Sequence, residues 1–186
     1  MTALVPSAGA SNPNAVAIPR HEQEPTQYLT FMLGGEIYAI GILSIKEIIE
    51  YGGLTTVPMA PGAIRGVINL RGAVVPVMDL SARFGRTSSE VTKRTCIVIV
   101  ETEGQGEHQV IGVIVDAVNA VQEIAGADIE PAPTFGMKIA SEFIAGMGKV
   151  NGKFVVLLNI HRVLLVDDLG QLQGVAQLAA PEEPRA

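Results

Sequence analysis

The sequence is short of the residues on which most metal sites, disulfides and nucleic-acid surfaces depend. It has one cysteine, no tryptophan and three histidines, and aromatic residues make up 4% of its 186 positions. The lone Cys96 excludes an internal disulfide, and no cysteine–histidine spacing of a zinc site surrounds it. Basic residues number 13 against 19 acidic ones, and so few aromatics leave little to stack on bases. We therefore expect no nucleic-acid partner, no metal site and no cofactor.

Long apolar runs are also missing. The longest, such as residues 96–100 and 154–158, fall well short of the ~20 residues that cross a bilayer. No basic segment followed by a long apolar stretch stands near the N-terminus, so no signal peptide is expected. Hydrophobic residues still make up 48% of the chain against 17% charged ones, enough for a substantial core. These features favour a soluble, cytoplasmic protein.

The two ends of the chain differ in composition from its middle. Residues 1–26 are rich in Ala, Pro, Ser and Asn without periodicity, and residues 170–186 end in Pro-Glu-Glu-Pro-Arg-Ala. Such segments bury too little apolar surface to offset the entropy cost of ordering them. We expect two disordered tails around a folded part at 27–169, with a cleaved leader as the alternative for the N-terminal segment.

Within the folded part, short runs rich in Val and Ile are separated by Gly, Pro and Asn, a pattern typical of strands in a small barrel or sandwich. The predicted strands are 28–33, 36–41, 55–58, 67–70, 74–79, 96–101, 108–115, 120–124, 146–150 and 154–159. Two-residue hairpin turns are expected at Gly34-Gly35, Arg71-Gly72 and Asn151-Gly152. Apolar residues at helical spacing predict two short helices, at 138–145 and 160–169.

A comparison of the chain with itself reveals an internal repeat. An offset of 80 residues aligns four identical pairs: Ile64 with Ile144, Gly66 with Gly146, Gly72 with Gly152, and Val75 with Val155. An offset of 73 residues aligns the apolar positions of 37–48 with those of 110–121. A repeat of this length is too long for a solenoid unit and indicates two copies of one small barrel. Because about 70 residues alone seldom bury enough surface, the copies should share a core and leave a groove between them.

The sequence offers no constellation for catalysis. Cys96 lies in an Ile/Val-rich strand, where thiols are usually inert, and His161 reads as a surface or capping residue. The glycines around Gly146 lack the Ser or Thr that a phosphate-binding loop places after its lysine. No three carboxylates converge as a metal site would require. We expect a protein that is not an enzyme.

Arg71 and Glu47 are the polar residues that stand out, because each lies in an apolar setting. Arg71 is in Gly-Val-Ile-Asn-Leu-Arg-Gly, and Glu47 is in Ser-Ile-Lys-Glu-Ile. One interpretation of Arg71 is a solvent-exposed hairpin arginine. The other is an interface arginine, since arginine is enriched at binding hot spots.

The stretch at 62–80, Gly-Ala-Ile-Arg-Gly-Val-Ile-Asn-Leu-Arg-Gly-Ala-Val-Val-Pro-Val-Met-Asp-Leu, resembles the signature of the CheW family of bacterial chemotaxis coupling proteins. The flanking motifs agree: Tyr-Ala-Ile at 38–40, Ile-Lys-Glu-Ile at 45–48, Ile-Gly-Val-Ile-Val-Asp at 111–116 and Phe-Ile-Ala-Gly-Met-Gly at 143–148. The resemblance covers about residues 27–165, with the motifs in order. Gly41 departs from it where many relatives carry an acidic residue, and His161-Arg162 replaces a commoner acidic–basic pair.

The resemblance implies a mainly β fold of two tandem five-stranded Src-homology-3-like barrels that share a hydrophobic core, with a short helix between strands and a C-terminal helix. We expect barrel one at about 35–92, barrel two at about 93–159 together with the N-terminal strand, and the C-terminal helix at 160–169.

The resemblance also implies a function. The protein would be a non-enzymatic scaffold that links the cytoplasmic tips of methyl-accepting chemoreceptors to the regulatory domain of the histidine kinase CheA, in arrays at the inner face of the membrane. The alternatives are a CheW-like adaptor of a non-flagellar pathway, for surface motility or second-messenger control, and a small-molecule-binding barrel or hydrolase.

By the same resemblance, three groups of residues have expected roles. Receptor and kinase coupling is expected of Arg71, Glu47, Ile45 and Ile42. Gly66 and Gly72 match structural turn glycines. A possible kinase contact consists of Val57, Pro58 and Ile64.

Overall fold

The computed structural model describes residues 25–104 and 106–165 and consists mainly of β-strands. Its strands are β1 (Thr26–Leu33), β2 (Glu36–Gly41), β3 (Ile45–Glu50), β4 (Ile64–Leu70), β5 (Ala73–Asp79), β6 (Cys96–Gly104), β7 (Glu107–Val115), β8 (Ala117–Ile124), β9 (Ile129–Glu130), β10 (Ile144–Val150) and β11 (Lys153–Leu158). The short helices are α1 (Leu80–Arg83) and α2 (Ile160–Leu164), with 3-10 turns η1 (Ile42–Ser44), η2 (Gly126–Asp128) and η3 (Ser141–Phe143). No helix in the described ranges is long and apolar enough to cross a membrane.

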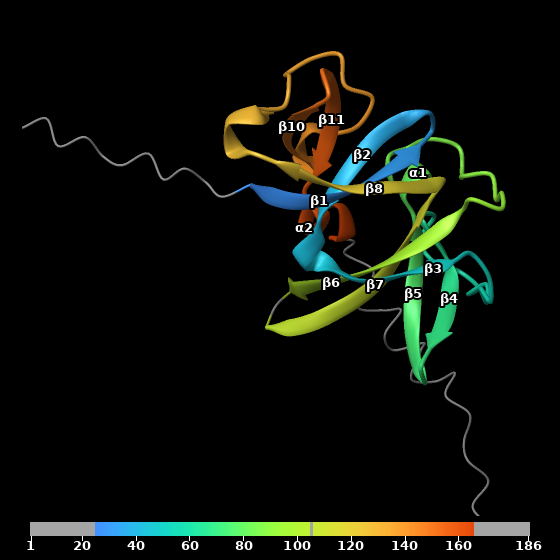
Figure 1. Cartoon of the computed structure of the whole chain (residues 1–186). Coiled ribbons are helices and arrows are strands. Elements are labelled where there is room, and N and C mark those ends of the chain that lie inside the picture. Colours follow the sequence, from blue (N-terminus) through green and yellow to red (C-terminus); the bar gives the residue numbers. More distant parts are fainter. Residues whose placement is uncertain (1–24, 105, 166–186) are drawn as a thin grey trace, which may run out of the picture.

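The strands form two sheets, each curled into a small barrel (Figure 1). In the six-stranded barrel the order is β8-β1-β2-β11-β10-β9, and in the five-stranded barrel it is β3-β6-β7-β5-β4. The first and last strands of each order are close in the chain. β8 leads through η2 into β9, which pairs with β10, while the segment after β3 reaches β4 through a bridge between Thr55 and Val67. The predicted pair of Src-homology-3-like barrels is confirmed.

The two barrels repeat one plan. In each, a parallel pair (β5 with β7, β11 with β2) joins the hairpin strands to the rest, and a bulge stands at the same place in β4 and β10. Asp79 and Asn159, 80 residues apart, each cap the short helix that follows the hairpin. The offset found in the sequence therefore marks a structural duplication.

The apolar side chains form three clusters. One fills the five-stranded barrel around Val77 and Ile99, and a smaller one fills the six-stranded barrel around Val155 and Leu157. The largest lies between the barrels and takes residues from both, among them Phe31 and Val113; we call it the shared core. Burial at about 25 cal/mol per Å² makes this shared surface a major part of the stability of both barrels. The shared core predicted from the repeat is confirmed.

The three expected hairpin turns are present, each with two residues between paired strand ends. Both turn residues have positive φ: 58° and 81° at Gly34-Gly35, 52° and 85° at Arg71-Gly72, 51° and 77° at Asn151-Gly152. Positive φ at both residues is typical of a type I′ turn, whose twist matches that of the two antiparallel strands that it joins.

Other local predictions were wrong. Residues 138–145 form only the turn η3 before β10 begins at Ile144, because Ile144 pairs with Leu158 and the Asn159 N–H donates to the Phe143 carbonyl over 2.8 Å. The segment 55–58 makes a single bridge instead of a strand, and β3 was not predicted. The short helix expected between strands is present as α1, outside the segments in which helical spacing had predicted helices. The helix expected at 160–169 ends at Leu164, because Leu165 has extended backbone angles. Residues 166–169 and both expected tails, apart from Pro25 and Thr26, lie outside the described ranges.

The expected division of the chain between barrels also needs correction. The strand at 36–41 is not in the same sheet as the strands within 45–79. Likewise, the strands within 96–115 are not in the same sheet as those within 117–158. The N-terminal hairpin β1–β2 pairs instead with β8 and β11, and the hairpin β6–β7 pairs with β3 and β5. Each hairpin therefore completes the barrel formed by the other half of the chain. Because of this exchange, the chain crosses between the two barrels and links them covalently.

Candidate functional site

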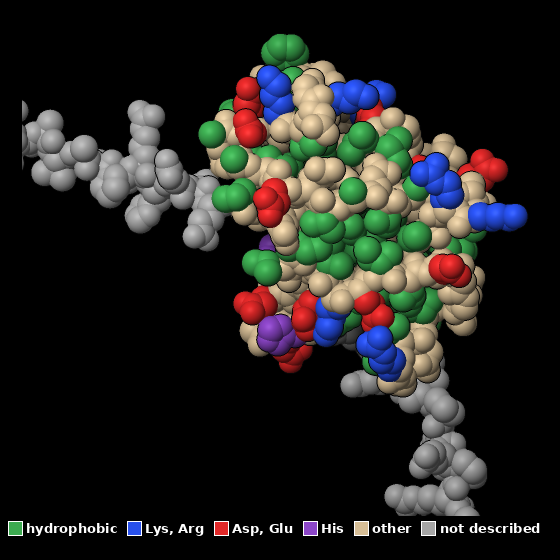
Figure 2. Space-filling view, viewed as in Figure 1, with side chains coloured by type: hydrophobic (Ala, Val, Ile, Leu, Met, Phe, Trp, Pro, Cys, Tyr) green, Lys and Arg blue, Asp and Glu red, His purple; other side chains and the backbone are tan. Residues whose placement is uncertain are grey.

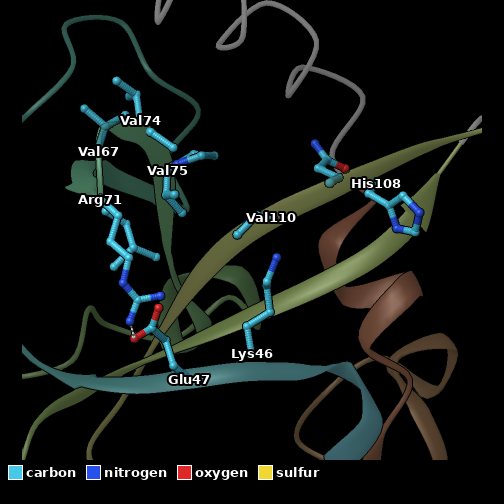
Figure 3. A pocket seen from close by; sticks show the side chains of 12 residues that line it. Lys46, Glu47, Val67, Arg71, Val74, Val75, His108 and Val110 are labelled. Carbon is cyan, nitrogen blue, oxygen red and sulfur yellow. Dashed lines mark hydrogen bonds and ion pairs between the residues drawn. The ribbon is translucent and has the colours of Figure 1, made fainter.

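Arg71 and Glu47 meet at one end of the five-stranded barrel. The Arg71 Nη2 atom lies 3.1 Å from Glu47 Oε2, joining the β4–β5 turn to β3 (Figure 3). The register of β3 against β6 shifts between Ile45 and Glu47, and along β3 Lys46 is exposed while Glu47 is half-buried. The Arg71 side chain is 80% exposed, so its guanidinium keeps donors free for a partner. The structure brings together two residues that the sequence placed 24 positions apart.

Beside this ion pair lies a hollow of about 360 Å³ at the mouth of the barrel. Its floor is apolar, from Val67, Leu70, Val74, Val75 and Val110, and its rim carries Lys46, Glu47, Arg71 and His108 (Figure 3). Lys46 Nζ is held 3.2 Å from Glu101 Oε1. An apolar floor with charged groups around it suits an apolar side chain of a protein partner better than a small charged substrate.

Arg71 occupies a backbone position that disfavours it. Its φ of 52° lies in the left-handed region, where residues other than Gly, Asn and Asp are uncommon. The equivalent turn of the six-stranded barrel has Asn151 there, with φ of 51°. Because the fold accepts asparagine at this position, folding alone does not account for an arginine.

Ile42 and Ile45 lie at the junction of the two barrels, both partly buried against the shared core. The elements near them carry further apolar side chains at the surface, which together we call the apolar band: Leu43 of η1, Ile48 of β3 and Val121 of β8 are exposed, and Val118 of β8 is half-buried. Figure 2 shows apolar side chains gathered across the middle of this face, between β8 and β3. The band was not predicted, because its members come from η1, β3 and β8, which the two barrels bring together.

The two glycines differ in what they do. A Cβ atom on Gly66 would stand 2.2 Å from the Thr55 carbonyl oxygen, so no side chain fits where the segment after β3 crosses β4. Gly72 has open space around it but a φ of 85°, which glycine adopts without strain. Its N–H donates to Asn69 Oδ1 over 2.9 Å, which fixes the turn beside Arg71.

The residues suggested for a kinase contact do not lie together on the surface. Ile64 is 6% exposed within the shared core, and Val57 packs against that core, while Pro58 is exposed. The exposed apolar side chain of their loop is Met59, which the sequence analysis missed. Pro58 indicates a turn in the sequence, but nothing local shows which side chain of the turn faces outward.

A polar network lies away from this site, beside the junction of the barrels. Glu36 accepts hydrogen bonds from the Tyr38 hydroxyl over 2.8 Å and from Arg86 Nη2 over 3.0 Å, and Lys138 Nζ lies 2.9 Å away. The hydrogen bond with Lys138, followed by those from Tyr38 and Arg86, lowers the pKa of Glu36 to about 2 despite partial burial. Burial and the neighbouring carboxylate raise the pKa of Tyr38 to about 12. Because the network connects the loop after α1 with the loop before β10, we interpret its role as structural.

Among the described residues, no three His, Cys, Asp or Glu side chains gather as a metal site would need. The charged groups at the barrel mouth are paired with one another, and the surfaces near them are apolar. Such an arrangement can recognise a protein surface through one arginine and apolar contacts.

A family model described as a CheW-like domain matches residues 27–167. The chain belongs to the CheW family. The chemotaxis protein CheW of Klebsiella aerogenes is 34% identical over 151 residues, covering 81% of this chain and 89% of that one. Protein FrzA of Myxococcus xanthus is 31% identical over 147 residues, covering 78% and 87%. The crystal structure of the scaffolding protein TtCheW from Thermoanaerobacter tengcongensis, 34% identical, superposes with a TM-score of 0.69 over 80% of this chain and 93% of that one.

Proposed function

We propose that the chain links the cytoplasmic tips of chemoreceptors to the regulatory domain of a CheA-type histidine kinase, without chemistry of its own. As a CheW-family member it is a chemotaxis scaffold of two-component signalling. Its place in the cell would be the cytoplasm, within receptor arrays under the membrane. The observation that carries the proposal is Arg71, held in a strained turn against Glu47 at the mouth of the five-stranded barrel.

Receptor coupling is assigned to this ion pair and to the apolar band bordered by Ile42 and Ile45. A helical hairpin presents ridges of apolar side chains, which match an elongated band with a charged group near one end. A scaffold transmits a signal only if it binds the receptor's two signalling states with different free energies, typically by 1–3 kcal/mol. An exposed arginine that can change partners between Glu47 and a receptor carboxylate supplies such a difference.

The test is Arg71→Asn, which places in this turn the residue that the second barrel has at Asn151. We expect receptor-fragment binding to weaken about tenfold, the scale of one hot-spot side chain, and kinase activation in reconstituted arrays to fall. Thermal stability should stay the same or rise, because asparagine suits a φ of 52°. The control Lys153→Ala removes an exposed cation from the other hairpin. Full receptor binding and kinase activation by Arg71→Asn would rule out this role for Arg71.

The alternative is the same scaffold role in a non-flagellar chemosensory pathway. The similarity to FrzA is close to that of the chemotaxis relatives, at 31% against 34% identity, so similarity alone does not separate the pathways. Deletion of the gene with assays of both swimming and surface motility separates them. Loss of swimming chemotaxis supports the first reading, and loss of surface motility alone supports the second.

A further inference from the structure

Met59 stands in a backbone conformation that its side chain disfavours. The described residues include three non-glycines with positive φ: Met59 at 58°, Arg71 at 52° and Asn151 at 51°. Pro58 and Met59 form a turn, and a positive φ directly after proline matches the type II turn position that usually takes Gly or Asn. Asparagine and glycine enter this region at little cost, whereas methionine does not. The turn itself therefore gives no reason for a methionine at this strained position.

The same residue carries a second unfavourable feature, because its side chain is fully exposed. The loop around it is firmly held. Thr55 and Val67 exchange two backbone hydrogen bonds of 2.8 Å, and the Ile64 N–H donates to the Pro61 carbonyl over 2.8 Å. Val57 and Ala60 on either side pack against the shared core. The loop therefore presents one large apolar side chain from a fixed backbone.

The corresponding position of the second half is built differently. At the offset of 80 residues that aligns Ile64 with Ile144, Met59 corresponds to Ile139, which is buried and has no positive φ. The duplicated fold therefore does not require an exposed side chain with positive φ at this position. Strain and apolar exposure at one residue together indicate a contact made outside the chain.

We propose that Met59 is the anchor by which this chain docks into an apolar pocket on the regulatory domain of the kinase. This rests on the proposed function, in which two partners are held at once. Met59 and Arg71 lie beyond opposite ends of β4, whose seven residues span about 20 Å, so their contacts can be occupied together. A single projecting side chain fits a pocket on a folded domain, whereas the apolar band suits a helical hairpin. Methionine, unbranched and polarisable, adapts well to such a pocket.

The test compares Met59→Gly and Met59→Leu in the full chain. Calorimetric titrations are made against the purified kinase regulatory domain and, separately, against a receptor-tip fragment. We expect Met59→Gly to weaken kinase-domain binding tenfold or more and to leave receptor binding within about twofold, as for a central hot-spot residue. Met59→Leu, which keeps an apolar side chain, should stay within a few-fold of the natural chain. The control Val91→Ala trims another exposed apolar residue and should change neither affinity.

A stability measurement separates an external contact from a structural role. Met59→Gly relieves the positive φ, so its melting temperature should equal or exceed that of the natural chain. A lower melting temperature would mean that the side chain serves the fold, and unchanged kinase binding would remove Met59 from the interface; either result overturns the proposal. If the natural chain binds neither the kinase domain nor the receptor fragment, the proposed function itself is wrong, and Met59 is no anchor either. That result differs from one in which the natural chain binds the kinase domain and Met59→Gly binds it equally well.

Discussion

Asp79 and Asn159, which stand at the same position in the two repeats, both cap their helices, but the Asp79 side chain accepts more hydrogen bonds than that of Asn159. Asp79 Oδ1 accepts from the Ser81 N–H over 2.9 Å and more weakly from the Ala82 N–H, and its other oxygen accepts from the Ser89 N–H over 3.0 Å. Asn159 Oδ1 accepts only a 3.3 Å bond, from Arg162, among the described residues. Asp79 is fully buried, with Arg65 3.6 Å away. The capping residue is therefore at the centre of a buried hydrogen-bond network in the first half only.

This difference predicts unequal costs of removal. Asp79→Ala leaves several buried N–H groups and Arg65 without their acceptor, and we expect it to lower the free energy of unfolding by about 3 kcal/mol or more. Asn159→Ala removes one cap at the surface and should cost about 1 kcal/mol. Urea denaturation of both variants measures the difference. Equal losses would show that the additional bonds of Asp79 contribute nothing.

Gly66 should tolerate no side chain. In Gly66→Ala the new Cβ would meet the Thr55 carbonyl oxygen at 2.2 Å, so β4 and the segment after β3 would have to separate. We expect a loss of about 2–4 kcal/mol, the scale of a strained backbone in a packed site. Gly62→Ala is the matched control, because a Cβ there has nothing within 4 Å and should change stability by less than about 1 kcal/mol. Thermal unfolding of the pair checks both expectations.

Arg83 should hold the two short helices together. Its Nε donates to the Val163 carbonyl over 2.8 Å and its Nη2 to the Leu165 carbonyl over 3.0 Å, and its guanidinium lies 4.7 Å from the centre of the Phe143 ring. Arg83→Met keeps the aliphatic packing and loses these contacts, so we expect a loss of about 1–3 kcal/mol. Arg162→Met changes an exposed arginine on α2 and serves as the control. Similar stability of the two variants in urea would contradict this role.

Glu36 should make part of the stability depend on pH. A carboxyl group whose pKa falls from 4.5 to about 2 on folding stabilises the native state above its unfolded pKa, and that contribution disappears as the pH falls through this window. Because Glu36 is partly exposed to solvent, we expect Glu36→Gln to cost only about 1 kcal/mol at pH 5–7. The cost should shrink steadily below pH 4.5.

Urea denaturation of the natural chain and of Glu36→Gln at pH 7, 5, 4 and 3 measures this window. The control Glu90→Gln alters an exposed carboxylate that makes no ion pair within the described part of the chain. A cost of Glu36→Gln that stays constant down to pH 3 would show that its partners Lys138, Tyr38 and Arg86 do not act through the charge.

Part of the candidate site could be predicted from the sequence. Arg71 and Glu47 stand out locally, because each is a charged residue among apolar ones, and the turn at Arg71-Gly72 follows from its glycine. That the two form an ion pair could not be predicted, because the contact depends on how β3 and the β4–β5 hairpin lie around the barrel mouth. The exposure of Met59 was missed for the same reason. Val57 and Met59 are both apolar, and only the packing of Val57 on the shared core decides which of them faces solvent.

Most of the strands, the tight turns and the duplication could be predicted from the sequence alone, because alternating apolar residues, paired turn glycines and a fixed offset are local or periodic signals. Which hairpin belongs to which barrel was decided only in three dimensions. Strands β1 and β2 leave their own half to pair with β8 and β11, since that arrangement closes both barrels and buries the shared core. Residues 138–145 carry a helical spacing of apolar residues, yet Ile144 becomes a strand residue opposite Leu158. In both cases, non-local pairing and burial outweighed the local pattern.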